Sequence, residues 1–125
     1  MSRSTLKDIS IDFLQLTAVG KSFEAFQVYA SENFIHHNPF FAGDANSLAS
    51  AMEENAKQNP DKVFEIKRIL EDGDFIAVYS HIRQNPAESG FAVMHILRFE
   101  DSKIAELWDI GQAVPERMVN EHGMF

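Results

Sequence analysis

The sequence contains no cysteine, which excludes disulfide bonds and thiolate metal sites. It also lacks an apolar run of the ~18 residues that a membrane-spanning helix needs, and its first residues lack the apolar stretch of a secretion signal. Basic residues are outnumbered: 11 Lys and Arg against 19 Asp and Glu give a net charge of -8, which repels nucleic acid and anionic lipid. We therefore expect a cytoplasmic protein with no nucleic-acid or membrane partner.

Apolar residues are plentiful, at 45 % of the chain, and 11 residues are Phe. A chain of 125 residues has the usual size of one domain and buries enough surface to fold without disulfides. We expect residues 1–125 to form a single domain with an aromatic core or pocket.

The first half of the chain has the spacing of helices. Apolar residues recur every three or four positions, with Ser4 as a candidate N-cap and Gly20 as a stop for the first helix. Asp44 or Asn46 can cap the third helix, and Pro60 ends it. The predicted helices span residues 5–19, 22–30 and about 44–59.

The second half alternates between apolar and polar residues, as strands do. A short strand is expected to end at Asn38, and Asp72-Gly73-Asp74 and Asp101-Ser102 are typical of tight turns. Successive hairpins would make an antiparallel meander with the helices on one face, which is an α+β architecture. Its predicted strands span residues 62–71, 75–83, 90–99 and 104–112.

Alternation sorts these strands into two faces. The turn at residues 101–102 would bring His95 opposite Trp108. The looser loop after Arg83 leaves two registers open: one places His81 beside His95, and a slip of one residue separates them. The face of His95 would combine rings with polar groups, as small-molecule pockets do: Phe75, Tyr79, His81, Phe91, His95, Glu106, Trp108 and Gln112.

The opposite face is aliphatic, and no predicted element covers it. Such a face commonly binds a partner, so we expect a homodimer formed through Val78, Met94, Ile96 and Leu107. Asp109 falls on this face, where it would pair with Arg98 or face solvent.

Each polar residue also has a purely structural interpretation. A histidine on an apolar strand is often a core residue with one satisfied hydrogen bond, and a tryptophan is more often core than ligand platform. In the pair His36-His37, one ring must point away from the pocket.

The chain resembles the SnoaL-like group of the nuclear transport factor 2-like superfamily. The resemblance covers nearly the whole chain and rests on the strand ending in His81 and on three segments: FIHHNPFF, HILRFEDSKIAELWDIGQ and VPE…NEHGMF. It implies a cone-shaped, cystatin-like fold in which a bent antiparallel sheet wraps around the N-terminal helices. Scytalone dehydratase, a member of the superfamily, works with pocket histidines and without a cofactor.

The resemblance also implies a site. In SnoaL-type cyclases a glutamate and a tryptophan precede an aspartate that acts as general base; Glu106 and Trp108 match, but Gln112 occupies the position of the base. Asp109 has the opposite parity and would reach the pocket only if the strand contains a bulge. His37 stands where relatives place an acid, near the end of the first strand.

These patterns predict a cofactor-independent acid–base enzyme: a lyase, isomerase or aldol cyclase acting on a small carbonyl or hydroxylated compound. His81 and His95 would be the base and acid, with His37 and Asp109 as further catalytic candidates. The expected substrate-binding residues are Phe34, Tyr79, Phe91, Glu106, Trp108 and Gln112. Two alternatives stay open: a ligand-binding domain without chemistry, and a metal site made by His37, His81, His95 and Glu106.

Overall fold

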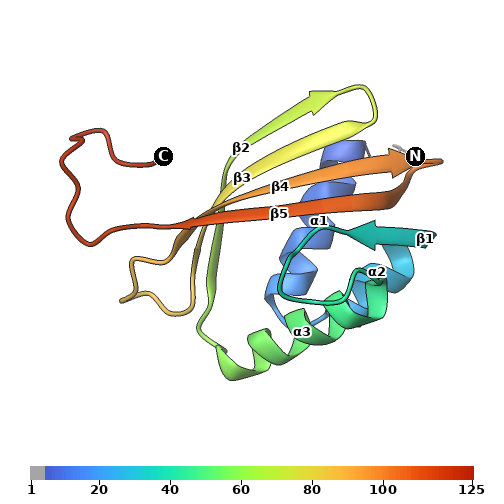
Figure 1. Ribbon diagram of the computed structural model, residues 1–125, viewed down its shortest axis with the longest axis horizontal. Helices are drawn as coiled ribbons and strands as arrows, with labels where there is room; N and C mark the ends of the chain where they lie inside the picture. Colours follow the sequence, from blue (N-terminus) through green and yellow to red (C-terminus); the bar gives the residue numbers. More distant parts are fainter. Residues whose placement is uncertain (1–4) are drawn as a thin grey trace.

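The computed structural model describes residues 5–125. A curved five-stranded sheet has the helices on its concave side (Figure 1). Within the described residues, no helix is long and apolar enough to cross a bilayer. The α+β class and the curved, cone-like sheet are as predicted. The elements are α1 (Leu6–Ala18), α2 (Ser22–Tyr29), β1 (Ala30–His36), α3 (Ala45–Gln58), β2 (Val63–Asp72), β3 (Phe75–Arg83), β4 (Phe91–Glu100) and β5 (Lys103–Ala113).

The strand order is β1-β5-β4-β3-β2. Strands β2 to β5 form the predicted antiparallel meander. Strand β1 pairs with β5 in parallel, so the sheet is mixed and the expectation of a purely antiparallel sheet is corrected at this edge. Because β1 and β5 are not consecutive in the chain, no hairpin forces them to run in opposite directions.

The ends of two helices have side-chain caps. The hydroxyl of Thr5 accepts a hydrogen bond from the Asp8 amide, and the Asp8 carboxylate accepts one from the Thr5 amide, each at 3.1 Å. Thr5 is thus the N-cap of α1, and Ser4, the predicted cap, lies outside the described residues. Asp44 caps α3, as predicted, by accepting from the amide of Ser47 at 2.9 Å.

The core lies between the helices and the inner face of the sheet. Phe13 and Leu97 are fully buried. Phe26 packs between Phe13 and Phe34, with ring centroids 5.0 and 5.2 Å away. Part of the chain's high phenylalanine content therefore builds the core.

A β-bulge in β5 decides which side chains enter that core. The turn residues Asp101 and Ser102 both have positive φ, and Phe99 pairs with Ile104 as the turn predicts. The next pair is Arg98 with Glu106, which leaves Ala105 as an extra residue on β5. From residue 106 onward, every side chain therefore points to the face opposite to the one that simple alternation predicts.

The predicted pairing of His95 with Trp108 is wrong for this reason: His95 pairs with Asp109, and Trp108 pairs with Ile96 on the outer face. The predicted outer face changes too. Val78 and Leu107 are fully buried, so they belong to the core, whereas Met94 and Ile96 stay on the outer face.

Candidate functional site

A cavity of about 260 Å³ lies between α1, α3 and the inner face of the sheet. Its wall is mainly apolar, and Phe41, which is 45 % exposed, stands at the rim. A mostly apolar hollow with a few polar groups is the usual form of a small-molecule site. The polar groups in this cavity are Thr17, Asn38, Asn55, Lys62, His95 and Asp109.

His95 stands at the centre of the inner face and is 4 % exposed. Burial lowers the pKa of His95 below its ordinary value of 6.5, although the nearby Asp109 carboxylate acts in the opposite direction. The ring is therefore neutral near pH 7. Its Nε2 lies 3.6 Å from Oδ1 of Asp109, and its buried Nδ1 has no hydrogen-bond partner among the described residues.

Asp109 is held from its other side by Asn38. The Asn38 side-chain amide donates to Oδ2 of Asp109 at 2.9 Å. Asn38 is itself fixed by His36, whose Nδ1 accepts from the backbone N–H of Asn38 at 3.1 Å while its Nε2 donates to the Ala42 carbonyl at 2.6 Å. Asp109 thus keeps a fixed orientation, with Oδ1 turned towards His95.

Asp109 reaches the cavity because of the bulge in β5, the condition that its parity in the sequence sets. It does not pair with Arg98, whose Nε instead donates to Glu106 at 2.9 Å on the outer face. The aspartate expected among aliphatic residues outside is therefore the carboxylate of the cavity.

His81 and Tyr79 do not share this cavity, so the prediction that placed them beside His95 is wrong. His81 pairs with Ala92, which is the one-residue slip that the loop after Arg83 left open, and its ring lies on the outer face. It donates from Nε2 to the Ser89 carbonyl at 2.7 Å and stacks on Phe125. The Tyr79 hydroxyl donates to the Met124 carbonyl at 2.6 Å.

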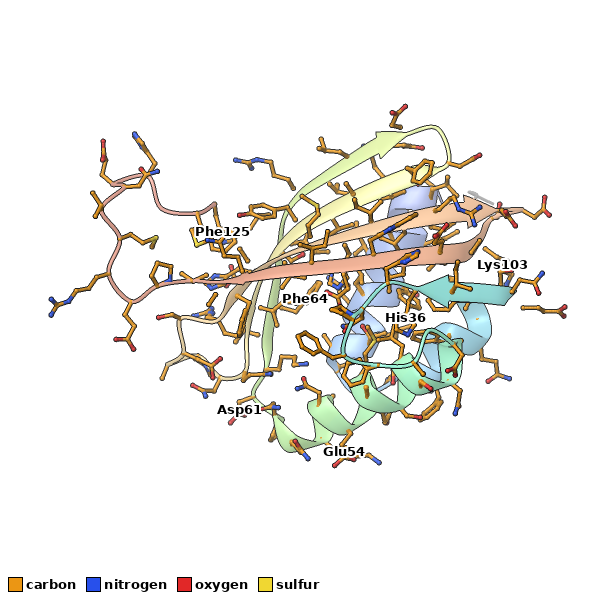
Figure 2. All side chains as sticks on the ribbon, in the orientation of Figure 1. His36, Glu54, Asp61, Phe64, Lys103 and Phe125 are labelled. Atoms are coloured by element: carbon orange, nitrogen blue, oxygen red, sulfur yellow. The ribbon has the colours of Figure 1, made fainter. Side chains whose placement is uncertain are left out.

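The C-terminal residue therefore covers part of the outer face. Figure 2 shows Phe125 and the cavity residue Phe64 on opposite sides of the sheet.

Glu106, Trp108 and His37 form a second cluster outside the cavity, because the bulge turns β5 over. The ring of His37 stacks on Trp108 at a centroid distance of 5.0 Å, and its Nε2 donates to Glu106 at 2.6 Å. The hydrogen bond from His37, followed by that from Arg98, lowers the pKa of Glu106. Glu106 and Trp108 share a face, as alternation predicts, but none of these three residues lines the cavity.

The remaining predicted wall residues also lie elsewhere. Phe34 is 5 % exposed and packs in the core, and Gln112 is exposed on the outer face. Phe91 lies near the end of the inner face, where it is 47 % exposed and lines a separate shallow hollow. Since His81 and His95 point to opposite faces, the four-residue metal shell considered from the sequence does not assemble. Among residues 5–125, no three His, Asp or Glu side chains converge as a metal site.

Four polar groups of the cavity were not singled out by the sequence, and one of them, Thr17, was only part of the first predicted helix. Asn38 and Lys62 were noted only as the ends of predicted strands, and Asn55 only as part of a helix. Asn55 lies one turn after Ala51 and Met52, on the helix face that lines the cavity. A polar residue beside an apolar helical stripe was therefore the signal that could have found it.

The sequence profile of the SnoaL-like domain matches residues 12–107. The chain belongs to the SnoaL-like domain family. No curated protein matches it.

Solved structures support the same fold. The chain is similar to a nuclear transport factor 2-like protein of unknown function from Cytophaga hutchinsonii, with 17 % identity, a TM-score of 0.71, and coverage of 89 % of this chain and 93 % of that one. It is also similar to AclR, a candidate hydroxylase from Streptomyces galilaeus, with 19 % identity, a TM-score of 0.72, and coverage of 89 % of this chain and 91 % of that one. A candidate SnoaL-like isomerase from Agrobacterium tumefaciens has 12 % identity and a TM-score of 0.67, with coverage of 87 % of this chain and 100 % of that one. These TM-scores establish the fold, but the sequence identities are too low to indicate the reaction, which must be argued from the site itself.

Proposed function

We propose that this SnoaL-like protein is a cofactor-independent acid–base enzyme, of lyase, isomerase or aldol cyclase type, acting on a small carbonyl compound. The observation that carries this proposal is the meeting of Asp109 and His95 in one cavity, on paired positions of β4 and β5. Asp109 would remove a proton from the carbon beside the carbonyl group, and His95 would donate a hydrogen bond to the oxygen that becomes the enolate.

The geometry supports this division of roles. Asn38 occupies Oδ2 of Asp109, so Oδ1 is the oxygen left to take a proton. A neutral imidazole has one N–H to donate and one nitrogen to accept, and burial keeps His95 neutral. The buried Nδ1 of His95 has no hydrogen-bond partner in residues 5–125, and such a group is one that a bound ligand satisfies.

Exchange of hydrogen for deuterium tests the proposed first step without knowledge of the product. We would incubate the protein in D2O with enones, β-keto compounds and hydroxy-aromatic compounds, and follow the loss of the α-hydrogen signal by NMR. Asp109→Asn keeps the shape but not the basicity, so it should slow exchange by roughly a hundredfold or more. His95→Gln should also slow exchange, since the imidazole is lost.

His81→Gln is the matched control, because His81 lies on the other face of the same sheet. It should exchange at the wild-type rate. Wild-type exchange by Asp109→Asn would contradict the proposal. If the panel compounds bind and none exchanges, the chain is instead a ligand-binding domain without this chemistry.

We also propose that the protein is a homodimer formed through the outer face of the sheet. Leu70 and Phe75 are 63 % and 43 % exposed there, near the partly buried Met94 and Ile96. Contiguous apolar surface of this kind is uncommon on monomers. Light scattering should give twice the chain mass for the wild type and a single chain mass for Ile96→Asp; a monomeric wild type would contradict the proposal.

A further inference from the structure

The cavity contains a lysine that the proposed proton transfer does not use. Lys62 lies just before β2, is partly buried, and lines the same hollow as His95 and Asp109. Its ammonium group donates to the side-chain oxygen of Asn55 on α3. Among the lining residues that the structure describes, Lys62 is the one Lys or Arg.

The ammonium group of Lys62 is paired with a neutral oxygen, as is that of Lys103 on the surface. By contrast, Lys67 and Arg83 both pair with the carboxylate of Glu65. Lys62 forms no salt bridge with any carboxylate in residues 5–125. A neutral amide oxygen accepts from it instead, and an ammonium group has three hydrogens to donate.

Holding this charge in a mostly apolar wall is unfavourable for the free protein. Lysine side chains usually extend until the ammonium group reaches water, and an ion that is partly withdrawn from water loses solvation. Consistently, burial lowers the pKa of Lys62. Filling this position for stability alone would favour an aliphatic residue, so the positive charge calls for an explanation in terms of binding.

We propose that Lys62 is the residue that selects an anionic substrate, by pairing with the carboxylate of a small oxo acid. The ammonium group binds the carboxylate, and the enolisable carbon of the same molecule lies at Asp109 and His95. The second half of this statement rests on the proposed function; the anion site itself does not.

Charge and size both favour a monocarboxylate. The net charge of -8 repels anions from the protein as a whole, so an acid enters this cavity only where a local cation attracts it. A phosphate group would call for several donors, commonly including arginine. One lysine with a single point charge in a hollow of about 260 Å³ suits a compact carboxylate.

Matched pairs of ligands test the anion site directly. Calorimetry would compare acetoacetate, 4-oxopentanoate and 5-oxohexanoate with their neutral amides. The wild type should bind at least one acid about tenfold more tightly than its amide, the usual effect of one charge-assisted hydrogen bond. Equal affinity for acid and amide throughout the series would overturn the proposal, and this comparison needs no variant.

Substitution then assigns the preference to Lys62. Lys62→Met should remove the preference for the acid and leave the affinity for the amide unchanged, while Lys62→Arg should retain part of it. Lys67→Met, five residues further along the chain and on the outer surface of β2, is the control and should bind as the wild type does. A preference that survives Lys62→Met would overturn the assignment.

The two proposals can fail separately. Binding of acids that depends on Lys62, without α-hydrogen exchange in any compound, would support the anion site and contradict the enzyme. Exchange of the oxo acids that is no faster than that of their amides, and equal in the wild type and Lys62→Met, would support the enzyme and contradict the anion site.

Discussion

His95 and His81 lie on neighbouring strands of one sheet and differ in almost every property that matters for chemistry. His95 is on the inner face and buried; one of its nitrogens has no partner in the described part of the chain, and the other lies near a carboxylate. His81 is on the outer face, bonded to a backbone carbonyl and covered by the C-terminal ring. The satisfied histidine stabilises local structure, whereas the unsatisfied one is available to a ligand. Partners, rather than residue type, distinguish the two faces.

The largest effect expected from this comparison concerns β5. Leu107 is fully buried and Gln112 exposed, whereas uninterrupted alternation would place Gln112 in the pocket and Leu107 outside. Leu107→Ala should lower the free energy of unfolding by about 3 kcal/mol, because it leaves a void in a packed core. Gln112→Ala should change it by less than about 0.5 kcal/mol. Urea unfolding measures both, and similar losses would show that the bulge is misplaced.

A second, smaller effect should appear in acid. The pKa of His95 is lower in the folded protein than the unfolded value near 6.5, so the unfolded chain binds more protons as the pH falls below that value. Stability is thus fully present above pH 6.5 and declines as the pH falls below that value, by at most ~1.4 kcal/mol per pH unit. In His95→Phe, the free energy of unfolding should depend less steeply on pH below 6.5, by this amount. His81→Phe should retain it, and a slope that persists in His95→Phe would argue against a buried neutral ring.

The smallest effect should come from the outer cluster. Glu106→Gln removes the carboxylate shared by His37 and Arg98, but these groups are exposed enough for solvent to screen them. The loss of unfolding free energy should be roughly a quarter or less of that for Leu107→Ala. Calorimetric binding of oxo acids should be unchanged. Weakened binding would link the outer cluster to the cavity and remove the distinction between the two faces.

Local patterns in the sequence were sufficient to predict the helices and the meander of β2 to β5. The helical stripe, the cap at Asp44, the turn at residues 101–102 and the meander all depend on near neighbours in the chain, and the structure contains each of them. The parallel pairing of β1 with β5 depends on residues some seventy positions apart, for example Ile35 and Glu106. Turn chemistry and alternation carry no information about such pairs.

The site was less predictable because side chains alternate with a period of two. One extra residue at Ala105 places Asp109 in the cavity instead of Trp108. A shift of one residue in the register between β3 and β4 places His81 on the outer face. Asn55 and Lys62 line the same cavity as Asp109 although they are far from it in the sequence, because the fold brings α3 and the start of β2 beside β5. Of the histidines proposed as catalytic, His95 alone lines the cavity.

The bulge at Ala105 has a consequence for how roles are compared within the family. Insertion or deletion of one residue ahead of residue 106 exchanges the set of β5 side chains that face a ligand. The amino-acid sequence of the strand hardly changes. Two homologues aligned without a gap there can agree in sequence and present opposite residues to their substrates. Which β5 side chains face the cavity should therefore be established before a catalytic role is transferred from one relative to another.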